Sequence, residues 1–204
     1  MSVRRKNNQK LVMMIELALL TAAVLILQLT GAAIKFTPGT TINLVLLPIA
    51  LGAMLLGPIS GAWLGFVCGV VVYVTCGVMA MDPFTATLFQ ANPVITAFIC
   101  ILKTTLAGLG AGFVYRLLRG KNAWVAGFVA AALTPIINTG LFILGCVVMM
   151  GTITDIAAAS GVSFVYFVFI LCAGVNFLLE LALNMILAPA LCRVVEIVSR
   201  QQSH

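Results

Sequence analysis

The sequence predicts an all-α integral membrane protein, a single bundle of six transmembrane helices with both termini in the cytoplasm. Hydrophobic residues make up 63% of its 204 residues, charged residues only 8%, and the mean hydropathy is +1.21. A soluble domain uses roughly a quarter of charged residues to cover its surface. The apolar residues also form long runs, and about 20 of them in a helix cross the hydrocarbon core of a bilayer. Residues 1–204 are therefore expected to form one membrane domain surrounded by lipid.

The individual spans follow from the apolar runs and from the breaks between them. Glu16 is the only charged residue in the first run, and Gly57-Pro58 divides the uncharged stretch 36–81 into two spans. The fourth span contains Lys103, and the sixth is long enough to project beyond the bilayer. Membrane β-strands would alternate apolar and polar residues, and these runs do not. The predicted spans are about 11–34, 41–57, 58–76, 93–118, 123–150 and 162–198.

The cations predict the orientation. Six spans place the N-terminus, the 116–122 connection and the C-terminus on one side of the membrane. The cations of that side are Arg4, Arg5, Lys6, Lys10, Arg116, Arg119, Lys121, Arg193 and Arg200. The opposite loops carry only Lys35, so the positive-inside rule places both termini in the cytoplasm. A cleaved signal peptide ending near 31–33 is the alternative for the first run, although its apolar part is longer than is usual.

Cysteine and histidine usage argues against a metal centre, a disulfide framework or histidine-dependent catalysis. The six cysteines are scattered through apolar runs without a CxxC pair, which favours small buried hydrophobic residues. The only histidine is the last residue, His204. The cations do not alternate with aromatic residues, so no nucleic-acid partner is expected. No catalytic residue, metal ligand or cofactor is predicted.

Small residues recur at four-residue intervals in three of the spans. They are Gly61, Gly65 and Gly69 in the third, Gly108 and Gly112 in the fourth, and Ala18 and Ala22 in the first. In lipid, such residues let helix backbones approach closely and gain van der Waals contact. We expect the glycines to serve internal packing. For the two alanines, the alternatives are internal packing and an outer groove that receives a partner's helix.

Polar residues stand inside the later spans, where lipid makes them costly. Lys103 lies about ten residues into its span, or about 15 Å below the outer surface at 1.5 Å per residue. A charge at that depth costs several kcal/mol unless it faces a cavity or a partner. The other polar positions are Asn92 and Thr96 on the face of Lys103, Asn138 and Thr139 after Pro135, and the stripe Asn176, Glu180 and Asn184.

Two interpretations of these residues stay open. In the first, Lys103 and Glu180 neutralise each other and the asparagines satisfy their own hydrogen bonds. In the second, the groups line a polar cavity open to the outer face, and the loops 77–93 and 35–41 cover its mouth. We favour the second, because one ion pair would not require the asparagines as well. The predicted solute-binding residues are Lys103, Asn138, Asn176, Glu180, Asn92 and Asn184.

Three local features together resemble one transporter family. They are the AxxxA of Ala18 and Ala22, "LLGPISGAWLGFVCGV" (55–70) and "KTTLAGLGAGFVYRLL" (103–118). In order and spacing they are similar to the substrate-binding S components of energy-coupling factor (ECF) transporters, and the likeness extends over essentially the whole chain. The resemblance implies six helices in a prokaryotic plasma membrane and high-affinity binding of a vitamin or similar micronutrient.

The resemblance also implies partners. The family works with a transmembrane coupling (T) subunit, which its first-helix AxxxA contacts, and with two cytoplasmic ATPases; Ala18 and Ala22 match that motif. Its ligand sits toward the outer side between helices 4 to 6, and the loaded subunit topples in the membrane. Consistently, the chain has no GxxxxGK[ST] run of its own.

The vitamin stays open. The glycine- and tyrosine-rich signatures of the biotin branch are absent, and Lys103 suits a ligand with a carboxylate or another acceptor-rich group, such as pantothenate. The rival functions are a self-sufficient secondary transporter, an intramembrane enzyme and a purely structural subunit. Residues 1–100 and 101–204 show no internal repeat, which disfavours a secondary transporter. The absence of an internal histidine from the sequence disfavours an intramembrane enzyme.

Overall fold

The computed structural model describes the backbone of residues 2–31, 35–37, 40–41 and 44–203, and the side chains of 10–30 and 44–199. Its helices are α1 (Ser2–Gly31), α2 (Leu46–Leu56), α3 (Pro58–Val72), α4 (Pro83–Ala91), α5 (Pro93–Leu118), α6 (Ala123–Val148), α7 (Met150–Ala159), α8 (Phe164–Tyr166) and α9 (Gly174–Ser203). Two π-helical segments, η1 (Tyr73–Val78) and η2 (Phe167–Cys172), continue α3 and precede α9. The strands β1 (Lys35–Thr37) and β2 (Thr40–Thr41) form a small antiparallel hairpin.

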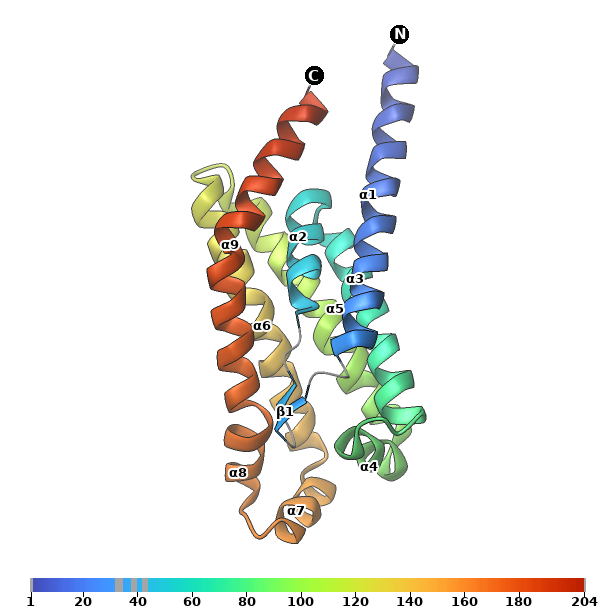
Figure 1. The fold of residues 1–204 in the computed structure, drawn as a ribbon, viewed down its shortest axis with the longest axis vertical. Coiled ribbons are helices and arrows are strands. Elements are labelled where there is room, and N and C mark those ends of the chain that lie inside the picture. Colours follow the sequence, from blue (N-terminus) through green and yellow to red (C-terminus); the bar gives the residue numbers. More distant parts are fainter. Residues whose placement is uncertain (1, 32–34, 38–39, 42–43, 204) are drawn as a thin grey trace.

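The helices form one elongated bundle with two distinct ends (Figure 1). Helix α1 begins and α9 ends at the same end, which we call the terminal end. The short helices α4 and α7 lie at the opposite end, which we call the distal end. The β1–β2 hairpin lies between these ends, and β2 contacts α9.

The all-helical fold class is confirmed, and among the described residues five helices are long and apolar enough to cross a membrane, while the count of six spans stays a prediction. By length and composition they are Lys10–Thr30, Pro58–Val78, Pro93–Leu118, Ala123–Val148 and Phe164–Ser199. The predicted span 41–57 corresponds to α2, which has only 11 residues. At 1.5 Å per residue it is about 16 Å long, roughly half the thickness of a hydrocarbon core. The chain of residues 40–41 is already in strand β2, so the apolar run that remains for the helix is short.

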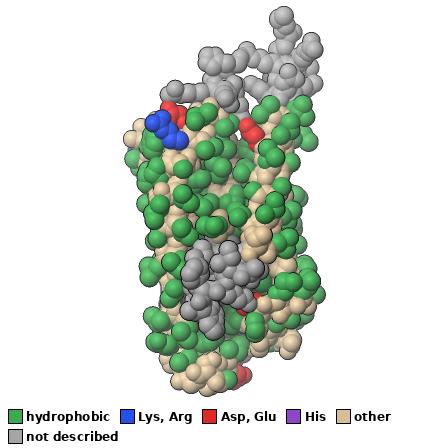
Figure 2. Space-filling model, in the orientation of Figure 1, with side chains coloured by type: hydrophobic (Ala, Val, Ile, Leu, Met, Phe, Trp, Pro, Cys, Tyr) green, Lys and Arg blue, Asp and Glu red, His purple; other side chains and the backbone are tan. Residues whose placement is uncertain are grey.

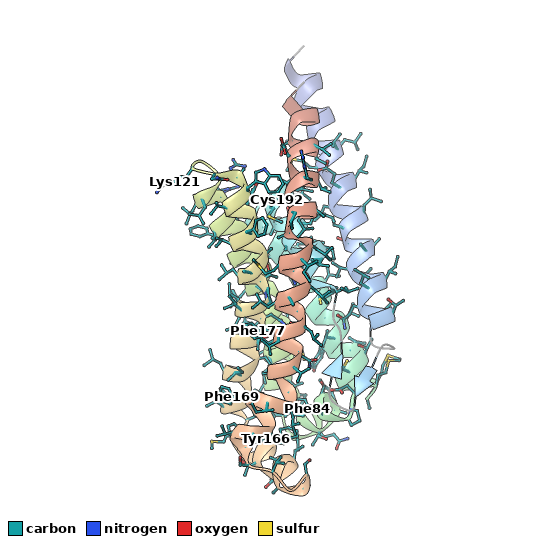
Figure 3. The ribbon with its side chains drawn as sticks, turned by 60° about the vertical axis from the view of Figure 1, so that its left-hand side comes forward. Phe84, Lys121, Tyr166, Phe169, Phe177 and Cys192 are labelled. Atoms are coloured by element: carbon teal, nitrogen blue, oxygen red, sulfur yellow. The ribbon has the colours of Figure 1, made fainter. Side chains whose placement is uncertain are left out.

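The face of the bundle shown in Figure 2 is largely apolar where it is described, as a lipid-facing surface requires. Large hydrophobic side chains are exposed on every long helix, for example Leu19 at 66%, Ile59 at 83% and Ile186 at 72%. Arg116 lies in the last turn of α5, and Arg119 and Lys121 lie in the connection to α6 at the terminal end, where Figure 3 labels Lys121. These three cations therefore lie at one end of the bundle, whereas Lys103 and Glu180 stand inside the long helices α5 and α9.

Helices α3 and α5 pack backbone to backbone through their glycines, as the four-residue spacing predicts. A Cβ atom on Gly61 would stand 2.5 Å from the carbonyl oxygen of Gly108, and one on Gly65 would collide with the backbone of Thr104. The Thr104 hydroxyl donates a hydrogen bond of 2.6 Å to the Gly65 carbonyl oxygen. Interhelical bonds of this kind hold helices together where water is absent.

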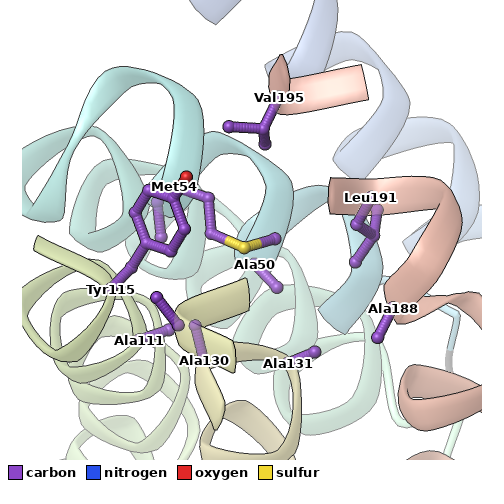
Figure 4. Close-up of a cluster of buried hydrophobic side chains, with 11 residues drawn as sticks. Ala50, Met54, Ala111, Tyr115, Ala130, Ala131, Ala188, Leu191 and Val195 are labelled. Atoms are coloured by element: carbon purple, nitrogen blue, oxygen red, sulfur yellow. The ribbon is translucent and has the colours of Figure 1, made fainter. Parts of the chain in front are cut away.

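A second tight region surrounds α2 near the terminal end, where small side chains from four helices meet (Figure 4). It contains Ala50 and Ala53 of α2, Ala111 of α5, Ala126, Ala130 and Ala131 of α6, and Ala188 of α9, with Met54, Tyr115, Leu191 and Val195. Alanines allow helices to approach closely in lipid. This cluster fixes the positions of α6 and α9, which carry most of the polar residues described next.

Candidate solute-binding site

The polar stripe of α9 faces the interior of the bundle. Glu180 and Asn184 are only 7% and 1% exposed. The Asn184 amide nitrogen donates to the Glu180 backbone oxygen at 2.8 Å, and the half-buried Asn176 donates to the Cys172 backbone oxygen at 3.1 Å. These i to i−4 bonds orient both amides along the helix, and the side-chain carboxyl of Glu180 stays directed at the neighbouring helix α6.

Asn138 of α6 meets this carboxyl group from the opposite side. Its side chain is close enough to the Glu180 side chain to interact with it, and it is 9% exposed, one helical turn after the buried Pro135 inside α6. The Asn138 Oδ1 atom has no hydrogen-bond partner among the described residues. The structure thereby brings together Asn138, Glu180 and Asn184, three of the predicted residues.

Two amide oxygens at this place lack hydrogen-bond donors. Asn138 Oδ1 and Asn184 Oδ1 are fully buried and have no partner within the described part of the chain. Leaving a buried acceptor unpaired costs about 1–3 kcal/mol. Most buried polar groups in proteins are paired, with water or a ligand where the protein supplies no donor. Next to the Glu180 carboxyl, the two oxygens form a group of acceptors with spare capacity.

Lys103 of α5 lies beside this group without forming a salt bridge. Its Nζ atom stands 5.1 Å from the centroid of the Phe142 ring, within cation–π distance. The only ion pair between described side chains joins Arg193 and Glu196, so the direct Lys103–Glu180 pair is not formed. The Lys103 ammonium is still close enough to interact electrostatically with Glu180. The half-buried cation and the acceptor group therefore share one region.

The contacts of Asn92 are those of a helix cap. Its Oδ1 accepts a hydrogen bond of 3.0 Å from the Ile95 backbone, and its own carbonyl accepts one of 2.9 Å from the Thr96 hydroxyl. Asn92 precedes Pro93 at the start of α5, a common pattern at helix N-termini. These bonds tie Asn92 to its own helix, and none of them joins it to Lys103, Glu180 or the other asparagines.

Aromatic side chains close the distal end above Lys103. The loop predicted to cover the site, 77–93, contains α4, whose N-cap Asp82 accepts bonds from the Thr85 backbone at 2.9 Å and hydroxyl at 2.7 Å. The Phe84 ring of α4 packs at a tilt against two others, with its centroid 6.2 Å from that of Phe142, the ring that Lys103 contacts, and 5.9 Å from that of Phe167 in η2. Figure 3 shows Phe84 at this end of the bundle. Apolar spans contain many phenylalanines, so nothing in their spacing had singled out these three.

A further buried polar residue joins the first helix to this region. Gln28 of α1 is 7% exposed, and its Oε1 atom lies 3.5 Å from the Sγ of Cys68 on α3. Cys68 is itself close enough to Lys103 and Glu180 for electrostatic interaction. Sequence reasoning missed Gln28, although a glutamine inside the first apolar run was a visible signal.

Comparison with known protein families gives one match. The family model of the ECF transporter, substrate-specific component, matches residues 12–192. The chain belongs to this family. A search of curated proteins finds no match. Members of the family are membrane-embedded substrate-binding subunits of a transporter and are not enzymes, and they associate with the ECF T subunit and ATPase subunits.

In this ECF substrate-specific component, Ala18 and Ala22 lie on the exposed side of α1. Leu19 and Ile26 are exposed on the same helix at 66% and 61%, whereas Val24 is completely buried. Of the two alternatives left open by the sequence, the described contacts of the bundle favour the outer surface over internal packing. The AxxxA is thus available to another chain.

Proposed function

We propose that this substrate-specific component binds a vitamin or similar small micronutrient among Lys103, Asn138, Asn176, Glu180 and Asn184, for uptake by an ECF complex. The carrying observation is the pair of buried amide oxygens without donors beside the Glu180 carboxyl. A purely structural polar network would be expected to satisfy its own acceptors. A solute with hydrogen-bond donors would pair with these two oxygens, and Asn92 serves this site only by starting α5.

The chemistry of the two sides defines the kind of solute. The Lys103 ammonium suits a carboxylate or another acceptor-rich group, because charge-assisted hydrogen bonds are the stronger ones. The oxygens of Asn138, Glu180 and Asn184 suit hydroxyl, amide or amine donors. The expected ligand therefore carries an acceptor group at one end and donors at the other. Pantothenate, with a carboxylate, an amide and hydroxyls, is one molecule of this kind.

The proposed transport cycle follows from this placement. Both termini lie in the cytoplasm, and the solute enters from the distal, outer end, where α4 and Phe84 then cover it. Ala18 and Ala22 hold the subunit against the T subunit. ATP hydrolysis by the partner ATPases topples the loaded subunit in the membrane, and its apolar exterior allows this rotation without exposing charge to lipid.

Native mass spectrometry of the purified subunit tests this proposal. The wild-type protein is expected to retain a small molecule with both acceptor and donor groups, and Glu180→Gln is expected to lose most of it. Glu196→Gln, a matched change at the terminal end, should retain the molecule. Equal retention by Glu180→Gln and the wild type would overturn the proposed site. A wild-type subunit that never copurifies with ATPases from its native membrane would contradict the proposed complex.

A further inference from the structure

A cavity of about 380 Å³ lies at the terminal end, away from the polar residues of the candidate site. It opens where α9 leaves the bundle, and its walls come from α5, α6 and α9. Tyr115, Trp124, Cys192, Glu196 and Ser199 are among the lining residues, and Figure 3 labels Cys192 at this level. A water molecule takes about 30 Å³ in the liquid, so the cavity has room for roughly ten heavy atoms.

Opposite charges stand side by side at this cavity. The Arg193 guanidinium lies 5.8 Å from the centroid of the Trp124 ring and 3.8 Å from the Glu196 carboxylate. A separation of 3.8 Å is longer than a hydrogen bond, and the Arg193 side chain is 69% exposed. Arg119 lines a smaller pocket that shares Tyr115 with this cavity, so it adds positive potential without lining the cavity itself. The site thus offers one guanidinium and one carboxylate within the reach of one small ligand.

The position of the cavity is that of a membrane interface. Tryptophan and tyrosine are enriched where the hydrocarbon meets the head groups, and Trp124 and Tyr115 both line it. Toward the middle of the bundle, the neighbouring helices expose apolar side chains, including Val129 at 38% and Met185 at 37%. Acyl chains lying on these side chains would hold a lipid head group at the level of Arg193.

We propose that this cavity holds the head group of a zwitterionic aminophospholipid such as phosphatidylethanolamine. The phosphate lies against Arg193, with Arg119 contributing to the positive potential, and the ammonium lies against Glu196. The lining carboxylate argues against a purely anionic lipid, because a like charge would be placed beside it. The two charges of the head group match the Arg193–Glu196 pair better than a single anion does.

Fluorescence quenching by brominated lipids tests this proposal directly. The chain has two tryptophans, and Trp63 is 49% exposed on α3, so Trp63→Phe leaves Trp124 as the reporter at the cavity. This variant is reconstituted into phosphatidylcholine vesicles with rising fractions of brominated phosphatidylethanolamine, phosphatidylglycerol or phosphatidylcholine. Brominated phosphatidylethanolamine is expected to quench half of the Trp124 fluorescence at a lipid fraction about two- to fivefold lower than the other two brominated lipids. A partly exposed charge pair gives an affinity difference of this size.

Two further variants locate the preference. Glu196→Gln keeps the shape of the side chain and is expected to abolish the preference for phosphatidylethanolamine, whereas Asp155→Asn, an acid at the distal end, should leave it intact. Circular dichroism and the melting temperature verify that each variant is folded. Equal quenching by all three lipids would overturn the proposal. So would a stronger effect of phosphatidylglycerol that Glu196→Gln leaves unchanged, or relief of quenching by added inorganic phosphate.

Discussion

The α3–α5 and α6–α9 interfaces both join two long helices, but they differ in how their polar groups are paired. Between α3 and α5, glycines bring the backbones into contact, and the Thr104 hydroxyl is satisfied by the Gly65 carbonyl at 2.6 Å. Between α6 and α9, larger polar side chains meet, and the oxygens of Asn138 and Asn184 have no donor among the described atoms. A closed interface gives stability, whereas an interface with spare acceptors gives binding capacity at a cost in stability.

The largest effect is expected at the closed interface. Gly65→Ala would drive a Cβ atom into the Thr104 backbone, and because backbone cannot move aside cheaply, we expect a loss of at least about 3 kcal/mol or failure to fold. The melting temperature in detergent measures it. Gly140→Ala is the matched control, since a Cβ there meets nothing within 4 Å. Equal melting temperatures for both variants would contradict the described α3–α5 packing.

At the open interface, removal of the cation should affect binding far more than folding. Lys103→Ala is expected to weaken binding of the retained solute by about ten- to a hundredfold, the value of a charge-assisted hydrogen bond. Isothermal titration calorimetry measures the affinity, with the exposed Lys121→Ala as control. Wild-type affinity in Lys103→Ala would mean that Lys103 is structural and only packs on Phe142.

Smaller effects on affinity and stability should distinguish Asn184 from Asn92. Asn184→Leu removes the unpaired Oδ1 acceptor together with the amide bond to the Glu180 backbone oxygen. The two effects on stability oppose each other, so the affinity should fall about tenfold while the ligand-free protein melts close to the wild type. Asn92→Ala removes a helix cap worth about 1 kcal/mol, so it should melt lower and bind normally. The same two measurements serve both variants. A loss of affinity in Asn92→Ala would return that residue to the binding site.

On the isolated subunit the smallest effect is expected at the exposed face of α1. Ala18→Trp adds a large side chain at a position that the described part of the subunit leaves exposed, so the melting temperature and solute affinity should stay as in the wild type. Association with the T subunit should be lost, because close helix approach depends on small residues. Copurification and uptake assays measure this. Loss of binding by the isolated variant would point instead to misfolding.

The long spans and the glycine contacts could be predicted because each depends on local composition or on a fixed four-residue interval. The shortness of α2 could not be predicted, since an apolar run does not reveal where a strand ends and a helix begins. Asn92 before Pro93 is a typical helix N-cap in sequence, but its position on the same face as Lys103 favoured a role in binding. Lys103 and Phe142 come from different helices, and their approach depends on tertiary packing alone. The donorless oxygens of Asn138 and Asn184 likewise become apparent only in three dimensions.

The shortness of α2 has a mechanical consequence. Because this helix covers only about half the depth of the bilayer core, the remaining depth beside α9 is taken by the β1–β2 hairpin. An isolated two-stranded hairpin is only marginally stable, so displacing it breaks far fewer bonds than unwinding or extracting a membrane helix. The least costly passage to the α9 stripe therefore runs past these two strands.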